Sequence, residues 1–364
     1  MKGLILAGGK GSRLRPITHT SAKQLVPVAN KPILFYVLED LVNAGIRDIG
    51  VIVGETAPEV RAALGDGAAW GAHLTFVDQP EPLGLADAVR VAGHFLGDDD
   101  FVMVLGDNLL EEGLGGLVDR YQRDLAEAGH PGGAAVPSAR LLLKEVDDPR
   151  PFGVVEVIDG RVVRIEEKPS APRSNLAMVG AYLFTARIHA AVAAIAPSLR
   201  GELEIADAIQ WLVDQGDDVR HELVRGWWLD TGKKDSILEA NRRVLARIES
   251  RIAGEIDGTS SVTGPVILEA GASLVRSTIV GPAVIGAGAI VEDSTIGPFT
   301  SIASGAAIVD SEVENSVLLE GVRLDGVPRL VDSLIGRFSH VTRSQDTPAA
   351  TRLLIGDHCS VDLQ

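Results

Sequence analysis

A glycine-rich turn near the start of the chain carries the first residues whose types and spacing could do chemistry. It contains Gly8, Gly9 and Gly11, and three basic residues follow within a few positions: Arg13, Arg15 and Lys23. Glycine lets backbone N–H groups approach an anion closely, and the basic side chains add fixed positive charge. Glycines alone would equally predict a tight strand-to-helix turn, but the basic residues favour a phosphate-binding loop.

Two common phosphate loops do not match this turn. Leu14 stands where a dinucleotide fingerprint has its third glycine, and Lys10 precedes the last glycine, whereas the lysine of a Walker A loop follows it. The turn therefore predicts a phosphate-binding loop of another type.

The elements that must position this loop alternate along the first two thirds of the chain. Strand-length apolar runs without polar alternation occupy residues 2–7, 49–53, 74–77 and 101–105. Helical periodicity occupies residues 33–44, 204–213 and 236–248, with Asn30 as the expected cap of the first helix. This pattern predicts an α/β fold with a largely parallel sheet. Asp107 closes one run and should emerge at the carboxyl edge, where such sheets bind ligands.

The last hundred residues follow a different pattern. Residues 274–279, 291–296 and 308–313 are similar segments that start 17 residues apart, and 330–335 reads as a fourth copy after a five-residue insertion. The aliphatic column Leu268, Ile285 and Ile302 has the same period. Such columns predict a parallel β-helix, with one last strand at 355–361. We predict a catalytic domain at 1–248, a linker at 249–260 and a β-helix domain at 261–364.

Composition limits the partners and the compartment. Thirty-four Lys and Arg against 50 Asp and Glu give a net charge of −16, which repels nucleic acid and anionic lipid, so neither is expected as a partner. The single cysteine, Cys359, cannot form an intrachain disulfide. Apolar runs are too short for a signal peptide or a membrane span, and a cytoplasmic protein is expected.

The motifs together resemble a known family. Residues 6–18, Leu-Ala-Gly-Gly-Lys-Gly-Ser-Arg-Leu-Arg-Pro-Ile-Thr, and residues 23–27, Lys-Gln-Leu-Val-Pro, resemble the signature of the sugar-1-phosphate nucleotidylyltransferases. Further segments resemble the glucose-1-phosphate thymidylyltransferases among them: 104–108, 152–156, 166–169, 200–205 and 228–232. The resemblance covers about residues 1 to 245 in order, and the repeats resemble the long forms of deoxysugar pathways. It implies a Rossmann-like nucleotidyltransferase domain with a mixed, mostly parallel sheet, followed by a left-handed β-helix.

The resemblance also implies a reaction. The phosphate oxygen of glucose 1-phosphate attacks the α-phosphorus of dTTP and releases pyrophosphate, which requires positive charge and positioning more than a nucleophilic side chain. Arg13 and Lys23 would hold the triphosphate, and Lys168 would bind the sugar phosphate. Asp107 and Asp230 would hold Mg²⁺ as a Lewis acid.

Further substrate contacts are implied in the same way. The nucleotide would be bound by Gly8, Gly9, Gly11, Ser12, Gln24, Gln79 and Gly84, with Gln79 on the pyrimidine edge. The sugar would be bound by Asn108, Gly153, Glu167, Val179 and Glu204. Relatives commonly have Thr or Ser where this chain has Ala206, which bears on a local cap or sugar contact and not on the activity. Leu83, beside the expected base loop, leaves dTTP and UTP both open, because one methyl group is worth only about 1–3 kcal/mol.

Three alternatives compete with this interpretation. UTP could replace dTTP in the same enzyme. A non-catalytic nucleotide-sugar-binding paralogue is disfavoured because all the expected basic and acidic residues are present. Acyl transfer, known for other β-helix proteins, is disfavoured because His340 and His358 lie in the irregular terminal part. The β-helix is interpreted as a structural or assembly element, and a homo-oligomer is expected.

Overall fold

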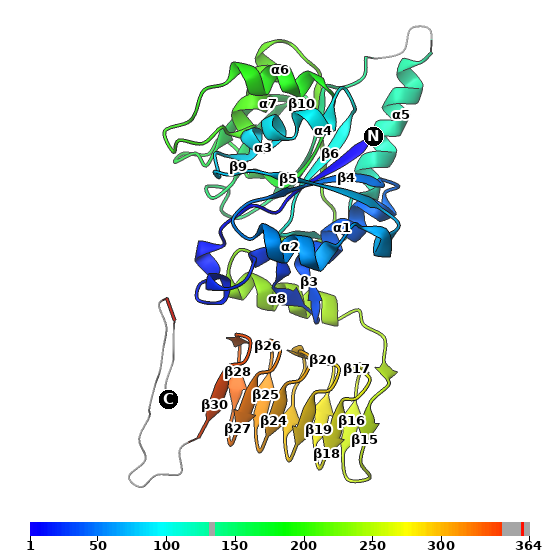
Figure 1. The fold of residues 1–364 in the computed structure, drawn as a ribbon. Helices are drawn as coiled ribbons and strands as arrows, with labels where there is room; N and C mark the ends of the chain where they lie inside the picture. Colours follow the sequence, from blue (N-terminus) through cyan, green and yellow to red (C-terminus); the bar gives the residue numbers. More distant parts are fainter. Residues whose placement is uncertain (131–134, 344–357, 360–364) are drawn as a thin grey trace. The chain divides into compact units, whose positions relative to one another are not determined.

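The computed structural model describes residues 1–130, 135–343 and 358–359, which divide into two compact units (Figure 1). The first unit comprises Met1–Lys10, Ser21–Leu25 and Ile33–Asp230. The second comprises Gly11–Thr20, Val26–Pro32 and the chain from Thr231 onward. The signature segment is therefore split, because its first glycines and Lys23 belong to the first unit and Arg13 to the second.

A mixed sheet, nine-stranded within the described residues, forms the centre of the first unit. Its strands are β1 (Lys2–Leu6), β4 (Asp48–Val53), β5 (His73–Asp78), β6 (Phe101–Leu105), β8 (Ala139–Glu145), β9 (Gly153–Ile158), β10 (Arg161–Glu167), β11 (Leu176–Phe184) and β12 (Val219–Leu223). The order is β10-β9-β11-β6-β1-β4-β5, with β8 pairing β11 and β12. Strands β6, β1, β4 and β5 run parallel, whereas β11 is antiparallel to its neighbours. The predicted Rossmann-like fold is confirmed.

Helices cover both faces of this sheet, as the uninterrupted apolar runs predict. Leu4 and Leu6 of β1 face one core, whereas Ile5 of β1 and the next residue after the strand, Ala7, face the other. The first core also contains residues of α3 (Leu85–Val91), α4 (Gly93–Leu96), α6 (Arg187–Ala194) and α7 (Ile205–Asp214). The second contains residues of α1 (Ile33–Asn43), α2 (Ala57–Leu64) and α5 (Gly115–Ala128). None of the helices in residues 1–130 and 135–343 has the length and apolar character needed to cross a bilayer.

The second unit contains α8 (Lys234–Leu245), the hairpin β2 (Pro27–Val28) and β3 (Lys31–Pro32), and a solenoid of three parallel sheets (Figure 1). One sheet comprises β14 (Arg251–Ile252), β17 (Val266–Leu268), β20 (Ala283–Ile285), β23 (Thr300–Ile302), β26 (Val317–Leu318) and β29 (Leu334–Ile335). Another comprises β15 (Glu255–Ile256), β18 (Ser273–Val275), β21 (Ile290–Glu292), β24 (Ala307–Val309), β27 (Arg323–Asp325) and β30 (His340–Thr342). The third comprises β16 (Ser261–Thr263), β19 (Thr278–Val280), β22 (Thr295–Ile296), β25 (Glu312–Glu314) and β28 (Leu330–Val331). Three parallel sheets are consistent with the predicted left-handed β-helix.

The strand register corrects the repeat alignment at one place. The predicted column is confirmed, since Leu268 pairs with Ile285 and Ile285 with Ile302. The fourth copy is misaligned, because Ile308 pairs with Leu324 and the segment from residue 330 lies on the next sheet. No five-residue insertion exists there. The Val-Asp-Ser motif recurs at a different corner of the coil, where the same backbone turn is required.

Two other expectations change, and a third is not tested. The predicted linker at 249–260 is wrong, because β14 and β15 pair with β17 and β18 and so form part of the first coil. Asn30 does not cap a helix; it has a φ of 61° in the β2–β3 hairpin and its Nδ2 donates to the Ile302 carbonyl at 2.7 Å. The strand predicted at 355–361 lies outside the described residues except for positions 358 and 359.

A buried asparagine of α8 connects the parts of the second unit. Asn241 is 1% exposed, and its Oδ1 accepts from the Ala29 N–H at 2.8 Å and the Ser301 hydroxyl at 2.7 Å. Its Nδ2 donates to the Phe299 carbonyl at 2.9 Å. One side chain therefore joins the β2–β3 hairpin, α8 and a coil of the solenoid.

Candidate functional site

The carboxyl ends of β1, β5 and β6 gather predicted site residues at one edge of the first unit's sheet. Gly8 and Gly9 follow β1, Gln79 follows β5, and Asp107 follows β6. Because β1 is parallel to β4 and β6, and β4 to β5, these strand ends lie on the same edge. Open α/β sheets bind their ligands at this edge.

Lys23 and Asp107 form a close ion pair there. The Lys23 Nζ donates to the Asp107 Oδ2, and the two side chains are 17% and 8% exposed. Gly9 allows this approach, because a Cβ at its position would lie 3.0 Å from the Lys23 Cε. The signature glycine thus gives a lysine access to the end of a buried strand.

The second predicted acidic ligand lies on the strand beside Asp107. The antiparallel pair of β7 (Asn108–Leu110) and β13 (Trp228–Asp230) sets Asp230 opposite Asn108. The Trp228 Nε1 donates to the Asn108 Oδ1 at 2.6 Å, and the Asn108 Nδ2 donates to the Asp107 Oδ1 at 3.2 Å. This hydrogen-bonded chain orients both Asn108 and Asp107.

Asp230 on β13 and Asp107 in the turn before β7 are two carboxylates that suit a divalent cation that also binds substrate. Such cations prefer oxygen ligands, and Mg²⁺ is commonly held by one or two carboxylates together with substrate phosphates. Within the part of the chain that the structure describes, His, Cys, Asp and Glu side chains form no cluster of three or more that could hold a metal. The donor set therefore fits a metal that arrives with a phosphate ligand.

The predicted sugar contacts gather around an arginine. Glu167 at the end of β10 pairs with Gly153 at the start of β9, and Glu204, 4% exposed, precedes α7. The Arg200 Nη2 lies 2.8 Å from the Glu204 Oε1 and 3.3 Å from the Glu167 Oε1. The Lys168 Nζ is 3.3 Å from the same Glu167 oxygen. Carboxylates and cations thus alternate in one cluster.

Arg200 is not among the site residues that were predicted from the sequence. Burial alone would lower the pKa of its guanidinium, but hydrogen bonding to Glu204 and the charges of Glu204 and Glu167 raise it. Arg200 is therefore a second cation near Lys168. One signal in the sequence could have pointed to Arg200. It is the first residue of the motif at 200–205, whose other residues are glycine, acidic or apolar.

Val179, the fifth predicted sugar contact, lies in β11 with its side chain fully buried. The ladder between β11 and β8 is interrupted between Met178 and Tyr182. An interrupted ladder leaves backbone groups for other partners, which suits the backbone contact that the resemblance implies for Val179.

The predicted base contacts also lie together. The Gln79 Nε2 is 3.3 Å from the Gly84 carbonyl oxygen and 2.7 Å from the Asp87 Oδ2. Gly84 has a φ of 109°, and a Cβ there would lie 2.3 Å from the Leu203 carbonyl oxygen. No other residue type fits this turn without displacing the backbone, so the packing of the turn itself requires glycine at this position. Asp87 is not among the base contacts that the sequence predicted.

The remaining nucleotide contacts divide between the two units. Gln24, in the first unit, is 1% exposed, and its Oε1 has no hydrogen-bond partner. Gly11, Ser12 and Arg13 belong to the second unit, where Gly11 has a φ of 63° and its carbonyl accepts from the Thr18 hydroxyl at 2.6 Å. The structure thus gathers the first-unit residues, and their roles, like those of Gly11, Ser12 and Arg13, stay predictions.

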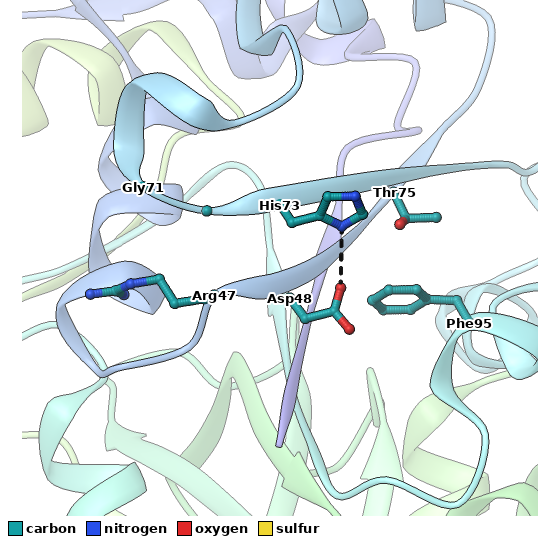
Figure 2. Close-up of a pocket in the computed structure, with 7 residues that line it drawn as sticks. Arg47, Asp48, Gly71, His73, Thr75 and Phe95 are labelled. Atoms are coloured by element: carbon teal, nitrogen blue, oxygen red, sulfur yellow. Dashed lines mark ion pairs between the residues drawn. The ribbon is translucent and has the colours of Figure 1, made fainter.

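A surface pocket of about 530 Å³ lies elsewhere in the first unit (Figure 2). It sits at the amino ends of β4 and β5, where the His73 Nδ1 lies 3.6 Å from the Asp48 Oδ1 and the Phe95 ring stands beside them. Its lining comprises Arg47, Asp48, Gly71, Ala72, His73, Thr75 and Phe95. None of these is a predicted site residue, and the amino ends of the strands lie opposite the ligand-binding edge.

The fold and the charged cluster define the class of the protein. Residues 2–247 match the nucleotidyl transferase family, and the chain belongs to that family. It is therefore an enzyme of the transferase class, and members of this family generally use a divalent metal.

Two relatives match this chain over nearly its whole length, and both are glucose-1-phosphate thymidylyltransferases. The glucose-1-phosphate thymidylyltransferase of Streptomyces griseus is 52% identical over 359 residues, covering 98% of each chain. The enzyme of the same name from Streptomyces antibioticus is 52% identical over 365 residues, covering 100% of each. A crystal structure assigned as a glucose-1-phosphate thymidylyltransferase from Bacillus anthracis, in complex with sucrose, is 35% identical with a TM-score of 0.61. It covers 68% of this chain and 95% of its own.

Proposed function

We propose that the chain joins dTTP and α-D-glucose 1-phosphate to give dTDP-glucose and pyrophosphate, the first step of a dTDP-deoxysugar pathway. One observation carries the reaction class: the Lys23–Asp107 pair at the carboxyl edge of the sheet, with Asp230 on the neighbouring strand. This arrangement offers charge and positioning to phosphate groups, which is what nucleotidyl transfer requires. The similarity to two thymidylyltransferases along the whole chain supports the choice of substrates.

The chemistry is mainly electrostatic. Asp107 and Asp230 would hold Mg²⁺, which supplies a Lewis acid for the phosphate oxygens when bound. Lys23 and Arg13 would neutralise the triphosphate, and Lys168 would steady the attacking oxygen of the sugar phosphate. Lysine suits the last role because its compact charge can follow a moving phosphate.

The sugar would be held by acceptor groups. Glu167 and Glu204 each offer carboxylate oxygens to sugar hydroxyls. Both are bridged by Arg200, so Arg200 keeps two acidic groups close together without substrate. The same guanidinium, near Lys168, would then meet the phosphate of the bound sugar.

The test is a set of initial rates of pyrophosphate release with glucose 1-phosphate, Mg²⁺ and each of dTTP, UTP, ATP, CTP and GTP. A clear preference for dTTP supports the proposal. Equal or better use of UTP would make the chain a uridylyltransferase with the same mechanism. Folded protein that turns over no nucleotide would refute catalysis and favour a nucleotide-sugar-binding role.

We also infer a homo-oligomer in which the solenoid takes part. The first coil has unpaired strand edges at β14, β15 and β16, each of which pairs on one side within the described sheets. Exposed edges favour pairing or capping by another surface. A mass equal to one chain, measured by light scattering on the full-length protein, would refute this.

A further inference from the structure

The amide of Gln79 is held from one side by two acceptors. Its Nε2 donates to the Asp87 Oδ2 at 2.7 Å and to the Gly84 carbonyl at 3.3 Å. Asp87 is 2% exposed in the first turn of α3, and its other oxygen, Oδ1, accepts from the Arg90 Nε at 2.9 Å. Gln79 is the residue expected to contact the pyrimidine edge, so any role of Asp87 in base recognition rests on the proposed function.

The chemistry of these partners decides which way the amide points. An ionised carboxylate and a backbone carbonyl can only accept hydrogen bonds, so the NH₂ group of Gln79 must face them. Both of its hydrogens are then engaged. The amide oxygen is consequently turned away from Asp87, and it lies on the side of the glycine-rich loop, where a Cβ on Gly8 would be 3.7 Å from it.

We propose that Asp87 is a positioning residue that sets base selectivity by obliging Gln79 to present an acceptor to the nucleobase. Thymine and uracil have an N3–H donor on their pairing edge, which satisfies the Gln79 Oε1. Cytosine has a lone pair at N3, and two acceptors would then face each other. A site built around one hydrogen bond rejects a ligand that cannot form it much more strongly than an apolar pocket rejects a missing methyl group.

A purely structural role for Asp87 makes a different prediction. A carboxylate in the first turn of a helix, paired with an arginine three residues later, stabilises that helix through its dipole and its charge. Loss of such a group would lower stability and would slow turnover of every nucleotide by a similar factor. The ratio between two nucleotides would not change.

The test is therefore a ratio: kcat/KM for dTTP over that for dCTP, with glucose 1-phosphate as the second substrate. In Asp87→Asn, the new amide can donate or accept, so Gln79 can flip and present its NH₂ to cytosine. We expect the ratio to fall at least about tenfold, whatever happens to the absolute rates. Asp87→Ser, whose hydroxyl also donates or accepts, should shift the ratio in the same direction.

Asp124→Asn is the matched control. Asp124 is also a buried aspartate, 8% exposed, held by Arg140 and Arg220, and it lies on α5. Its variant should keep the native ratio. An unchanged ratio in folded Asp87→Asn or Asp87→Ser would overturn the proposal.

A binding measurement on the native enzyme covers the case in which neither variant folds. Calorimetry should show much weaker binding of N3-methyl-dTTP than of dTTP, because the methylated base has no donor for Gln79. Equal binding of the two would refute the acceptor that Asp87 is proposed to impose. Native enzyme that does not use dTTP at all would instead refute the proposed function, so the two failures are distinguishable.

Discussion

Replacing Lys23 with methionine removes the cation that faces Asp107. The two side chains are 17% and 8% exposed, so water screens their charges poorly. Methionine keeps the aliphatic length that packs beside Gly9, and the change is mainly the loss of one charge. The variant therefore isolates the electrostatic part of the pair.

The expected magnitude follows from burial. Removing one partner of a buried ion pair costs about 3–5 kcal/mol, because the remaining charge is uncompensated. Lys23 is partly exposed and Asp107 keeps its hydrogen bond from Asn108 at 3.2 Å. We therefore expect the free energy of unfolding to fall by about 3 kcal/mol, the lower end of that range. Adding Asp107→Asn removes the buried charge, so the lysine change should cost at least about 1 kcal/mol less in that background.

The assay is urea unfolding followed by tryptophan fluorescence, combined with pyrophosphate release. All four tryptophans lie in the first unit, at positions 70, 211, 227 and 228, so fluorescence reports on the unit that contains the pair. Turnover should fall about 10²–10³-fold in Lys23→Met, because no positive charge is restored for the phosphates, and it should fall further in the double variant, which also lacks a proposed metal ligand.

Arg150→Met is the control, since the Arg150–Asp148 pair is 65% and 49% exposed and its loss should leave the free energy of unfolding nearly unchanged. A double-mutant coupling below about 0.5 kcal/mol would refute the buried pair as an energetic unit. Native turnover in Lys23→Met would remove Lys23 from the triphosphate site.

Three further predictions concern other parts of the chain. Trp228→Phe removes the Nε1 donor to Asn108, so KM for glucose 1-phosphate should rise about fivefold, equivalent to about 1 kcal/mol, and an unchanged KM would contradict the orienting role. Asn241→Ala leaves the buried Ser301 hydroxyl and two part-buried backbone groups without this partner and should destabilise the second unit by about 2–4 kcal/mol, seen as faster hydrogen exchange at residues 26–32; unchanged protection would count against it. Burial and the charge of Glu204 raise the pKa of Asp207 above its unfolded value, so its stabilising contribution is present below the unfolded pKa and lost as pH rises through the folded one. Asp207→Asn should therefore raise Tm at pH 7 and leave it nearly unchanged at pH 3, and a lower Tm at pH 7 would refute this reasoning.

Several candidate site residues could be proposed from the sequence because local sequence carries their signal. The glycine-rich turn and Lys23 stand in one continuous signature, and Asp107 closes an apolar run that has the length and character of a buried strand. Glu167 and Glu204 lie in short motifs that the family resemblance identifies. Arg200 and Asp87 were not predicted, because only their contacts in the folded chain indicate a role. The Asp87–Gln79 contact depends on how the turn at Gly84 folds.

In the repeat domain, too, one part of the structure could be predicted from the sequence and another part could not. The period of 17 residues was readable because each coil must place an aliphatic residue on the coil before it, as Leu268, Ile285 and Ile302 do. The misplaced fourth copy had the right residue types, since every corner of a coil uses similar turn chemistry. Only strand pairing distinguished one corner from another, and it also assigned residues 251–256 to the first coil.

The element types and the solenoid period could be read from the amino-acid sequence, because they follow from local propensity and from periodic burial. Most of the charged residues proposed for the site could also be picked out, because they stand in short local motifs. Which of these residues meet became clear only in the folded chain. Asp107 and Asp230 are separated along the chain and become neighbours through the pairing of β7 with β13. Arg200 meets Glu167 through the folding of residues 168–199 between them. Such contacts depend on register and chain crossing, which are properties of the whole fold and leave no periodic trace in the sequence.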